Sequence, residues 1–213
     1  MLKVGLTGGL ASGKSFVGHA LEELGCLLVE ADKLGHEVLL PGAEAYDATV
    51  AEFGREVLLA DGTIDRKALA ALVFGKPERL EVLNRIVHPP VRARGASMEQ
   101  AFAAVHPDGI AVHEAAILIE TGSYKKFDRM IVAVCTEEQQ IERAMHRDGA
   151  SRESVMDRLA RQMPLREKTR FAHFVIDTSG SKENTLRQTE AVYRELRKLA
   201  DEKGSGDLTI HAE

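Results

Sequence analysis

One eight-residue segment near the N-terminus constrains the fold of this chain more than any other: Gly8-Gly9-Leu10-Ala11-Ser12-Gly13-Lys14-Ser15, which matches the pattern G-x-x-x-x-G-K-[ST]. An apolar run, residues 2–7, leads into it and reads as a short buried strand. Apolar residues at helical spacing follow from Lys14 to Leu24, and Gly25 is typical of a helix end. A strand that enters such a turn and a helix that leaves it form the context in which this pattern binds nucleotide phosphates.

Each residue type in this loop has a chemical reason to be there. Gly8 and Gly13 permit backbone conformations closed to other residues, so that main-chain N–H groups can face phosphate oxygens. The helix N-terminus adds partial positive charge. Lys14 is predicted to reach the β- and γ-phosphates of ATP as a catalytic cation, and the Ser15 hydroxyl to coordinate Mg²⁺. The predicted ATP-binding residues are Gly8, Gly9, Leu10, Ala11, Ser12, Gly13, Lys14, Ser15 and Phe16.

Further apolar runs predict the other strands of a sheet, at residues 26–29, 109–119, 130–134 and 174–176. Residues 33–105 are expected to be mostly helical, with loops at Pro41-Gly42 and Asp61-Gly62 and a break at Pro89-Pro90. A basic helical stretch is predicted over about 137–171 and a long helix over about 182–203.

Continuous apolar strands that alternate with helices indicate a parallel sheet covered on both faces, in an α/β fold. We expect a doubly wound core of the P-loop NTPase type, formed by residues 1–32, 106–136 and 172–203. A helical substrate lobe is expected at 33–105 and a helical lid at 137–171, so that residues 1–203 make a single domain and 204–213 a flexible tail.

Composition limits the partners and the compartment. The formal net charge of −5 gives no overall attraction for nucleic acid or anionic lipid. No apolar run reaches the roughly 18 residues of a membrane span, and the N-terminal run is too short for a signal peptide. The two cysteines, Cys26 and Cys135, lie in or beside apolar runs and suggest buried thiols rather than a disulfide. We therefore expect a cytoplasmic protein that binds neither nucleic acid nor membrane, whose oligomeric state the sequence leaves open.

A phosphate loop by itself leaves three classes of protein: a small-molecule kinase, a regulatory GTPase, or an ATP-driven motor. Asp32 to Gly35 matches the D-x-x-G of GTPases, but it comes only one helix and one strand after the loop, and no N-K-x-D sequence occurs. A motor usually has a longer chain. The kinase is favoured, with a nucleotide-binding regulatory protein as the rival from another class.

Asp32 is the candidate catalytic base of such a kinase. The acceptor hydroxyl loses a proton as it attacks, and a carboxylate can take that proton. Asp32 follows the second predicted strand, and ligands of parallel sheets gather at the carboxyl ends of the strands. The alternative is that Asp32 caps a helix beginning at Lys33.

Several segments, in the right order over about residues 2–200, resemble the dephospho-coenzyme A kinase family. The segment from Gly5 to Ser15 looks like the start of these kinases, and Val29 to Asp32 is similar to their V-[ID]-D-A-D. Matching segments follow at Asp61 to Leu69 (D-G-x-[IL]-[DN]-R-x-x-L), Leu83 to Arg92 (L-x-x-x-I-H-P-x-V), Arg158 to Gln162 (R-[IL]-A-x-Q) and Val175 to Asp177. Departures from the family pattern are Phe16, Glu30, Ala116, His173 and Thr178.

The resemblance implies that ATP phosphorylates the ribose 3′-hydroxyl of dephospho-CoA, giving CoA and ADP in the final step of coenzyme A biosynthesis. A nucleoside, nucleotide or sugar-acid kinase of similar design is the alternative within enzymes. The residues predicted to bind the acceptor are Thr7, Asp32, Arg66 and His88. Thr7 is equally suited to a hydrogen bond within the sheet, and His88 to a structural role at a helix break.

Arg143 and Arg147 are candidate catalytic cations, because they are four residues apart on one helix face and phosphoryl transfer needs positive charge around the migrating group. The resemblance makes their segment a mobile lid, which excludes water when it closes. Glu114 and Glu120 flank the apolar end of the third strand. Either can approach Mg²⁺, but a solvated or capping role is favoured for both.

Overall fold

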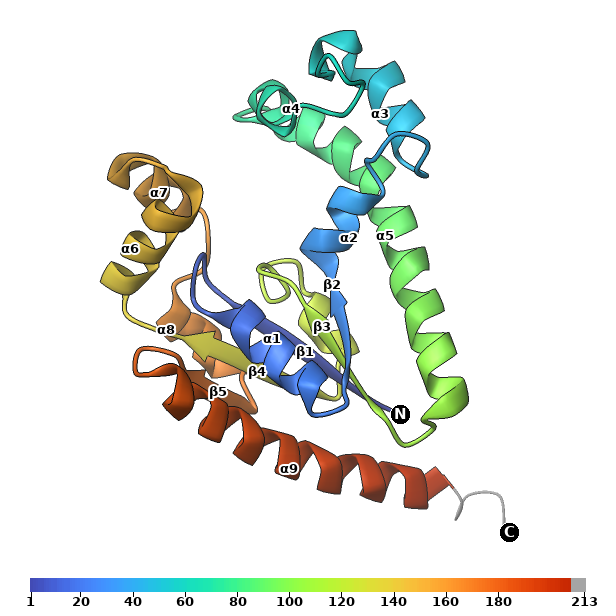
Figure 1. Ribbon diagram of the computed structural model, residues 1–213, viewed down its shortest axis with the longest axis vertical. Helices are drawn as coiled ribbons and strands as arrows, with labels where there is room; N and C mark the ends of the chain where they lie inside the picture. Colours follow the sequence, from blue (N-terminus) through green and yellow to red (C-terminus); the bar gives the residue numbers. More distant parts are fainter. Residues whose placement is uncertain (208–213) are drawn as a thin grey trace. The chain divides into compact units, whose positions relative to one another are not determined.

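The computed structural model describes residues 1–207 (Figure 1). The chain forms two compact units. The first unit contains residues 1–29 and the residues from 101 onward, and the second contains residues 30–100.

The first unit is built on a five-stranded sheet (Figure 1). Its strands are β1 (Leu2–Gly8), β2 (Leu27–Glu30), β3 (Ile110–Glu114), β4 (Arg129–Val134) and β5 (Phe174–Asp177), in the order β2-β3-β1-β4-β5. β1 lies in parallel register with β3, where Leu2 pairs with Ile110, and with β4, where Val4 pairs with Arg129. β4 and β5 are also parallel. The α/β fold expected from the alternating apolar runs is confirmed.

The core of this unit forms between the sheet and the helices that pack on it. Helix α1 (Lys14–Glu23) packs against β1, β3 and β4 and against helix α9 (Lys182–Asp207). Apolar side chains from these elements interdigitate because each helix turns a stripe of them towards the sheet. The buried members of the cluster include Leu2, Val4, Leu6, Val17, Leu21, Cys26, Leu28, Ile131, Ile176 and Leu196.

The predicted lid segment is helical. It contains α6 (Glu137–Asp148), α7 (Arg152–Leu159), the short α8 (Leu165–Lys168) and the 3-10 turn η3 (Thr169–Phe171); another 3-10 turn, η2 (Ser123–Lys126), precedes β4. Thr136 and Gln139 form a capping box at the start of α6, and the Ser151 hydroxyl caps α7 by accepting from Ser154 N.

The second unit is helical, as predicted. Its elements are α2 (Ala31–Glu37), α3 (Tyr46–Phe53), the 3-10 turn η1 (Arg55–Val57), α4 (Arg66–Val73) and most of α5 (Pro77–Val105). Its small core contains Phe53, Val57, Ile64, Leu69 and Val73. The predicted turns are present, with Gly42 and Gly62 at φ values of 79° and 83°, a backbone region that favours glycine.

The predicted helix break at Pro89-Pro90 is wrong. Helix α5 runs from Pro77 to Val105 with both prolines inside it. Proline removes a backbone donor and crowds the preceding turn, yet its fixed φ of about −65° is a helical value. The break therefore depends on whether the rest of the helix tolerates two missing hydrogen bonds, and a 29-residue helix does so here.

Two other boundaries differ from expectation. The predicted strand 109–119 ends at Glu114, and Leu118 and Ile119 are buried without being extended. Apolar character indicates burial, and buried turns share it with strands.

Helix α9 continues to Asp207, beyond the predicted end at about 203. The rest of the predicted tail, 208–213, lies outside the described residues.

Candidate active site

The phosphate loop lies between β1 and α1. Both of its predicted conformational glycines were expected to adopt a backbone closed to other residues, but only Gly13 has a positive φ, and Gly8 is required by close packing instead. Gly13 has a φ of 84°, and a Cβ there would lie 2.9 Å from the hydroxyl oxygen of Thr178. A Cβ at Gly8 would lie 2.8 Å from the carbonyl oxygen of Ala133. Any larger residue at either position would push the loop away from β4 and from the residue that follows β5.

Lys14 and Ser15 meet the last residue of β3 at the start of α1. The Ser15 hydroxyl donates to Glu114 Oε1 at 2.7 Å, and Lys14 Nζ lies 3.4 Å from the same oxygen. Glu114 is only 5% exposed, and its other carboxylate oxygen, Oε2, has no hydrogen-bond partner among the described residues. The solvated or capping role favoured for Glu114 is therefore wrong. Glu114 pairs with Leu6 in the β1–β3 register, and this places its carboxylate beside the loop.

Lys168 is a site residue that the sequence analysis missed. Its side chain is fully buried, and Nζ donates to the carbonyl oxygens of Gly8 at 3.1 Å and Ala116 at 2.7 Å. Its charge is matched by Glu120, whose Oε1 lies 2.9 Å away and also accepts from Met163 N. A buried ammonium requires such partners. Glu120 is thus a structural counter-ion, although the residue remains partly open to solvent as expected. No local pattern distinguishes Lys168 from the other basic residues of its segment.

Thr7, predicted to contact the acceptor, is fully buried and donates its hydroxyl hydrogen to Ala116 O at 3.1 Å. The structure therefore assigns this hydroxyl to the interior of the fold, because a donor in that position already satisfies a backbone carbonyl.

Arg143 reaches the loop through Thr178. Its guanidinium donates to Thr178 Oγ1 at 3.2 Å and to Thr178 O at 2.8 Å, while the Thr178 hydroxyl donates to Ser12 O at 2.8 Å. Arg143 is therefore linked to the phosphate loop through one intervening residue, Thr178.

Arg147 has a different neighbour. Its guanidinium makes two hydrogen bonds to Asp148, at 2.7 and 3.1 Å, and Arg158 donates to the same carboxylate at 2.6 Å. These two guanidinium groups hold the pKa of Asp148 well below its usual range. Although Arg143 and Arg147 share α6, only Arg143 is directed towards residues that contact the loop.

Three exposed residues of the second unit lie close together: Asp32, His36 and Arg66. Asp32 and His36 are one turn apart on α2, and Arg66 Nη1 lies 3.3 Å from His36 Nδ1. The pKa of His36 is lowered by desolvation and by the positive charge of Arg66, against the opposing influence of Asp32. His36 was missed, although its spacing of four residues from Asp32 is a usable signal.

The capping alternative for Asp32 is wrong. Helix α2 begins at Ala31, so Glu30 occupies the cap position and Asp32 lies within the first turn.

His88 is exposed on α5, and its pKa is lowered by partial desolvation and by the charge of Arg92. Since α5 is continuous at this point, the helix-break role considered for His88 has no basis in the structure.

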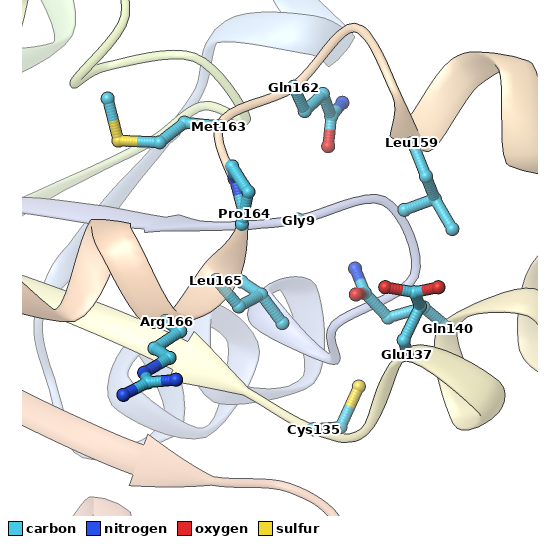
Figure 2. Close-up of a pocket in the computed structure, with 10 residues that line it drawn as sticks. All are labelled: Gly9, Cys135, Glu137, Gln140, Leu159, Gln162, Met163, Pro164, Leu165 and Arg166. Carbon is cyan, nitrogen blue, oxygen red and sulfur yellow. The ribbon is translucent and has the colours of Figure 1, made fainter.

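A cavity of about 260 Å³ lies beside the phosphate loop (Figure 2). Its walls come from Gly9, the end of β4, helix α6 and the segment that joins α7 to α8. The lining residues are Gly9, Cys135, Glu137, Gln140, Leu159, Gln162, Met163, Pro164, Leu165 and Arg166. Burial raises the pKa of the Cys135 thiol, which keeps it protonated at neutral pH.

A parallel sheet whose first strand leads into a glycine loop, with Lys14 and Ser15 at the following helix N-terminus, defines a P-loop nucleotide-binding protein. Comparison with known families narrows this class. Residues 2–184 match the family model of dephospho-CoA kinase. The chain belongs to the dephospho-CoA kinase family, as the resemblance of its motifs predicted.

Individual members of this family align with nearly the whole chain. The dephospho-CoA kinase of Geobacter metallireducens is 43% identical over 195 residues, which are 92% of this chain and 96% of the relative. That of Aquifex aeolicus is 40% identical over 196 residues, 92% of this chain and 98% of the relative.

Two solved structures are also similar. A Thermus thermophilus protein designated TT1252 has a TM-score of 0.76 at 33% identity, and the dephospho-CoA kinase of Campylobacter jejuni has 0.64 at 28% identity. Each comparison covers 92% of this chain and 97% of the other.

Proposed function

We propose that this chain transfers the γ-phosphate of ATP to the ribose 3′-hydroxyl of dephospho-CoA, giving ADP and CoA in the final step of coenzyme A biosynthesis. The observation that carries the proposal is the arrangement of Lys14, Ser15 and Glu114 at the end of the phosphate loop, in a chain that belongs to this kinase family. In phosphoryl transfer the protein mainly positions the reactants and stabilises charge, and these residues supply both functions.

Mg²⁺ is the metal that fits this arrangement. The Ser15 hydroxyl and the Glu114 carboxylate are hard oxygen ligands, and the unpartnered Glu114 Oε2 provides a free lone pair. No group of three or more His, Cys, Asp or Glu side chains that could hold a metal occurs in residues 1–207. Mg²⁺ typically needs no such cage, because it keeps several waters and binds substrate phosphates through one or two protein groups.

Lys14 and Arg143 supply the positive charge in the proposed reaction. The Lys14 ammonium would exchange its contact with Glu114 for the phosphate oxygens once nucleotide and metal occupy the site. Arg143, already directed to Thr178 beside Ser12, would reach the triphosphate from α6. Arg147 would join it only by leaving Asp148. The proposed lid, residues 137–171, would carry both arginines, with 1–32, 106–136 and 172–203 as the core.

Asp32 is the proposed base. It takes the proton of the acceptor hydroxyl, the oxygen attacks the γ-phosphorus, and the bond to the β-phosphate oxygen breaks to release ADP. Its position directly after β2 and the exposure of its carboxylate support this role. Arg66, held near Asp32 by way of His36, and His88 on α5 are proposed acceptor-binding residues in a helical lobe spanning 33–105.

No helix within residues 1–207 has both the length and the apolar character to cross a membrane. We place the proposed activity in the cytoplasm, and the net charge of −5 favours small-molecule partners over nucleic acid.

An acceptor screen tests the proposed function. Purified protein with Mg-ATP should release ADP far faster with dephospho-CoA than with adenosine, AMP or gluconate. Comparable rates with AMP or gluconate would contradict the proposed acceptor and indicate another small-molecule kinase. Release that requires a protein partner would favour a regulatory protein instead.

A further inference from the structure

Leu10, at the tip of the phosphate loop, is packed into a hydrophobic cluster that is separate from the core between the sheet and helices α1 and α9. Its side chain is 8% exposed and lies in a cluster with Ile141 and Ala144 of α6 and Val155 of α7. The loop tip is therefore part of the hydrophobic core that holds the α6–α7 pair together. Displacing Leu10 would expose this core to water, at a cost typical of removing a buried leucine.

Both backbone polar groups of Leu10 are held by glutamine side chains. Leu10 N–H donates to Gln162 Oε1 at 2.8 Å, and Gln140 Nε2 donates to Leu10 O at 2.7 Å. A backbone N–H can only donate and a carbonyl can only accept, so these contacts determine which end of each amide faces the loop. Both glutamines line the cavity beside Gly9 (Figure 2), and Gln140 is only 5% exposed.

Helix α6 is linked to the loop on both sides of Ala11, directly at Leu10 and through Thr178 at Ser12. Gln140 binds Leu10 directly, and Arg143, three residues later on the same helix face, binds Thr178, which holds Ser12 O. Ala11 between these two anchors has a φ of 53°, an unusual value for a residue with a side chain. Such a conformation persists only where the surrounding contacts determine it.

We propose that Gln140 and Gln162 are positioning residues: together they hold the Leu10 peptide so that the N–H groups of the residues after it face the phosphates of ATP. Gln140 also fixes α6, and with it Arg143, to the loop. Preorganising the loop avoids the entropy cost of ordering it when the nucleotide binds. The proposal rests on the ATP binding of the proposed function but not on the identity of the acceptor.

The opposite roles of the two amides allow a charge-matched test. Gln162→Glu keeps an oxygen that can accept from Leu10 N–H, whereas Gln140→Glu places a carboxylate against Leu10 O, where a donor is needed. Both variants add one negative charge to the same cavity. Mg-ATP affinity, measured by titration calorimetry without acceptor, should fall about tenfold more in Gln140→Glu than in Gln162→Glu, on the scale of a lost hydrogen bond with a buried group left unsatisfied.

The pH dependence of Gln140→Glu provides a second readout. A protonated carboxyl carries an O–H that can donate to Leu10 O, and burial raises the pKa of a carboxyl. The affinity of Gln140→Glu for Mg-ATP should therefore recover, relative to Gln162→Glu, as the pH falls from 8 to about 6. A purely structural role in stability would not produce this recovery in folded protein.

Gln188→Glu is the control for loss of a glutamine–backbone contact elsewhere. Gln188 on α9 accepts from Asp177 N and donates to Asp177 O, and it does not touch the loop. The variant should keep wild-type affinity. If Gln140→Glu does not fold by circular dichroism, Gln140→Met removes the donor without adding charge and should weaken Mg-ATP binding in the same direction.

Equal affinities of Gln140→Glu and Gln162→Glu at every pH would overturn the proposal, as would an equal loss in Gln188→Glu. Failure of the wild type to phosphorylate dephospho-CoA would contradict the proposed function alone, because this test measures nucleotide binding without any acceptor.

Discussion

Ser15 donates its hydroxyl hydrogen to Glu114 Oε1 at 2.7 Å, which joins the end of β3 to the first turn of α1. If these two oxygens share the metal, Glu114→Gln should weaken Mg²⁺ binding and raise the half-saturating Mg²⁺ concentration, because an amide oxygen carries no charge. We expect a loss of about 10–100-fold in activity, the scale seen when groups supporting a metal are changed. Mg²⁺ titration of the rate checks it. An unchanged half-saturating Mg²⁺ concentration would remove Glu114 from the metal site.

Lys14→Ala should lower kcat by about 10²–10³, the scale of removing one electrostatic stabiliser of the transition state. It should also lower the thermal midpoint, because Glu114 is buried and would lose its nearby cation. The double variant Lys14→Ala/Glu114→Gln should regain part of that midpoint without regaining activity. Near-wild-type turnover of folded Lys14→Ala would show that the loop lysine takes no part in catalysis.

Asp32→Asn tests the proposed base. The change should reduce kcat by roughly 10²–10⁴, the usual range for a positioned acid–base group, while ATP affinity is retained. Stability should change little, because Asp32 is exposed and does not occupy the cap position of α2. Glu30→Gln, at the neighbouring cap, is the matched control and should be milder. A kcat for Asp32→Asn within about threefold of wild type would contradict the assignment.

Cys26 should make stability depend on alkaline pH. Burial raises the pKa of its thiol from 9.0 to about 12, and the charge of Arg197 opposes this only in part. Between these values the unfolded thiol loses its proton while the native one keeps it. The free energy of unfolding should therefore fall as the pH rises from 9 towards 12.

Urea unfolding of wild type and Cys26→Val at pH 7 to 10.5 measures this effect. Other groups titrate in the same range, but they are common to both proteins. The loss of stability with pH should be shallower in Cys26→Val. Parallel curves would show that the native thiol ionises as readily as the unfolded one.

Local sequence was sufficient to predict the phosphate loop, because its residues are neighbours along the chain. Gly13 acts through its positive φ, and Lys14 and Ser15 act through the end of one helix, and both are encoded within eight residues. The close approach of Gly8 to Ala133 is not encoded there. The alternation of apolar runs with helical stretches likewise predicted the parallel sheet, and the order of the motifs predicted the family. Local pattern failed at Pro89-Pro90, where a whole helix and not one dipeptide decides the conformation.

Only the tertiary structure identified the residues that hold the loop in place. Glu114 lies 99 residues from Ser15, Gln162 lies 152 residues from Leu10, and Lys168 lies 160 residues from Gly8. In the sequence each resembles an ordinary polar residue of a strand end or basic helix. Their roles arise because the sheet order places β3 and β4 beside β1 and because buried polar groups must find partners across the fold. Whether a glutamate or lysine is solvated or buried against a peptide depends on which elements become neighbours, and that is a property of the folded chain.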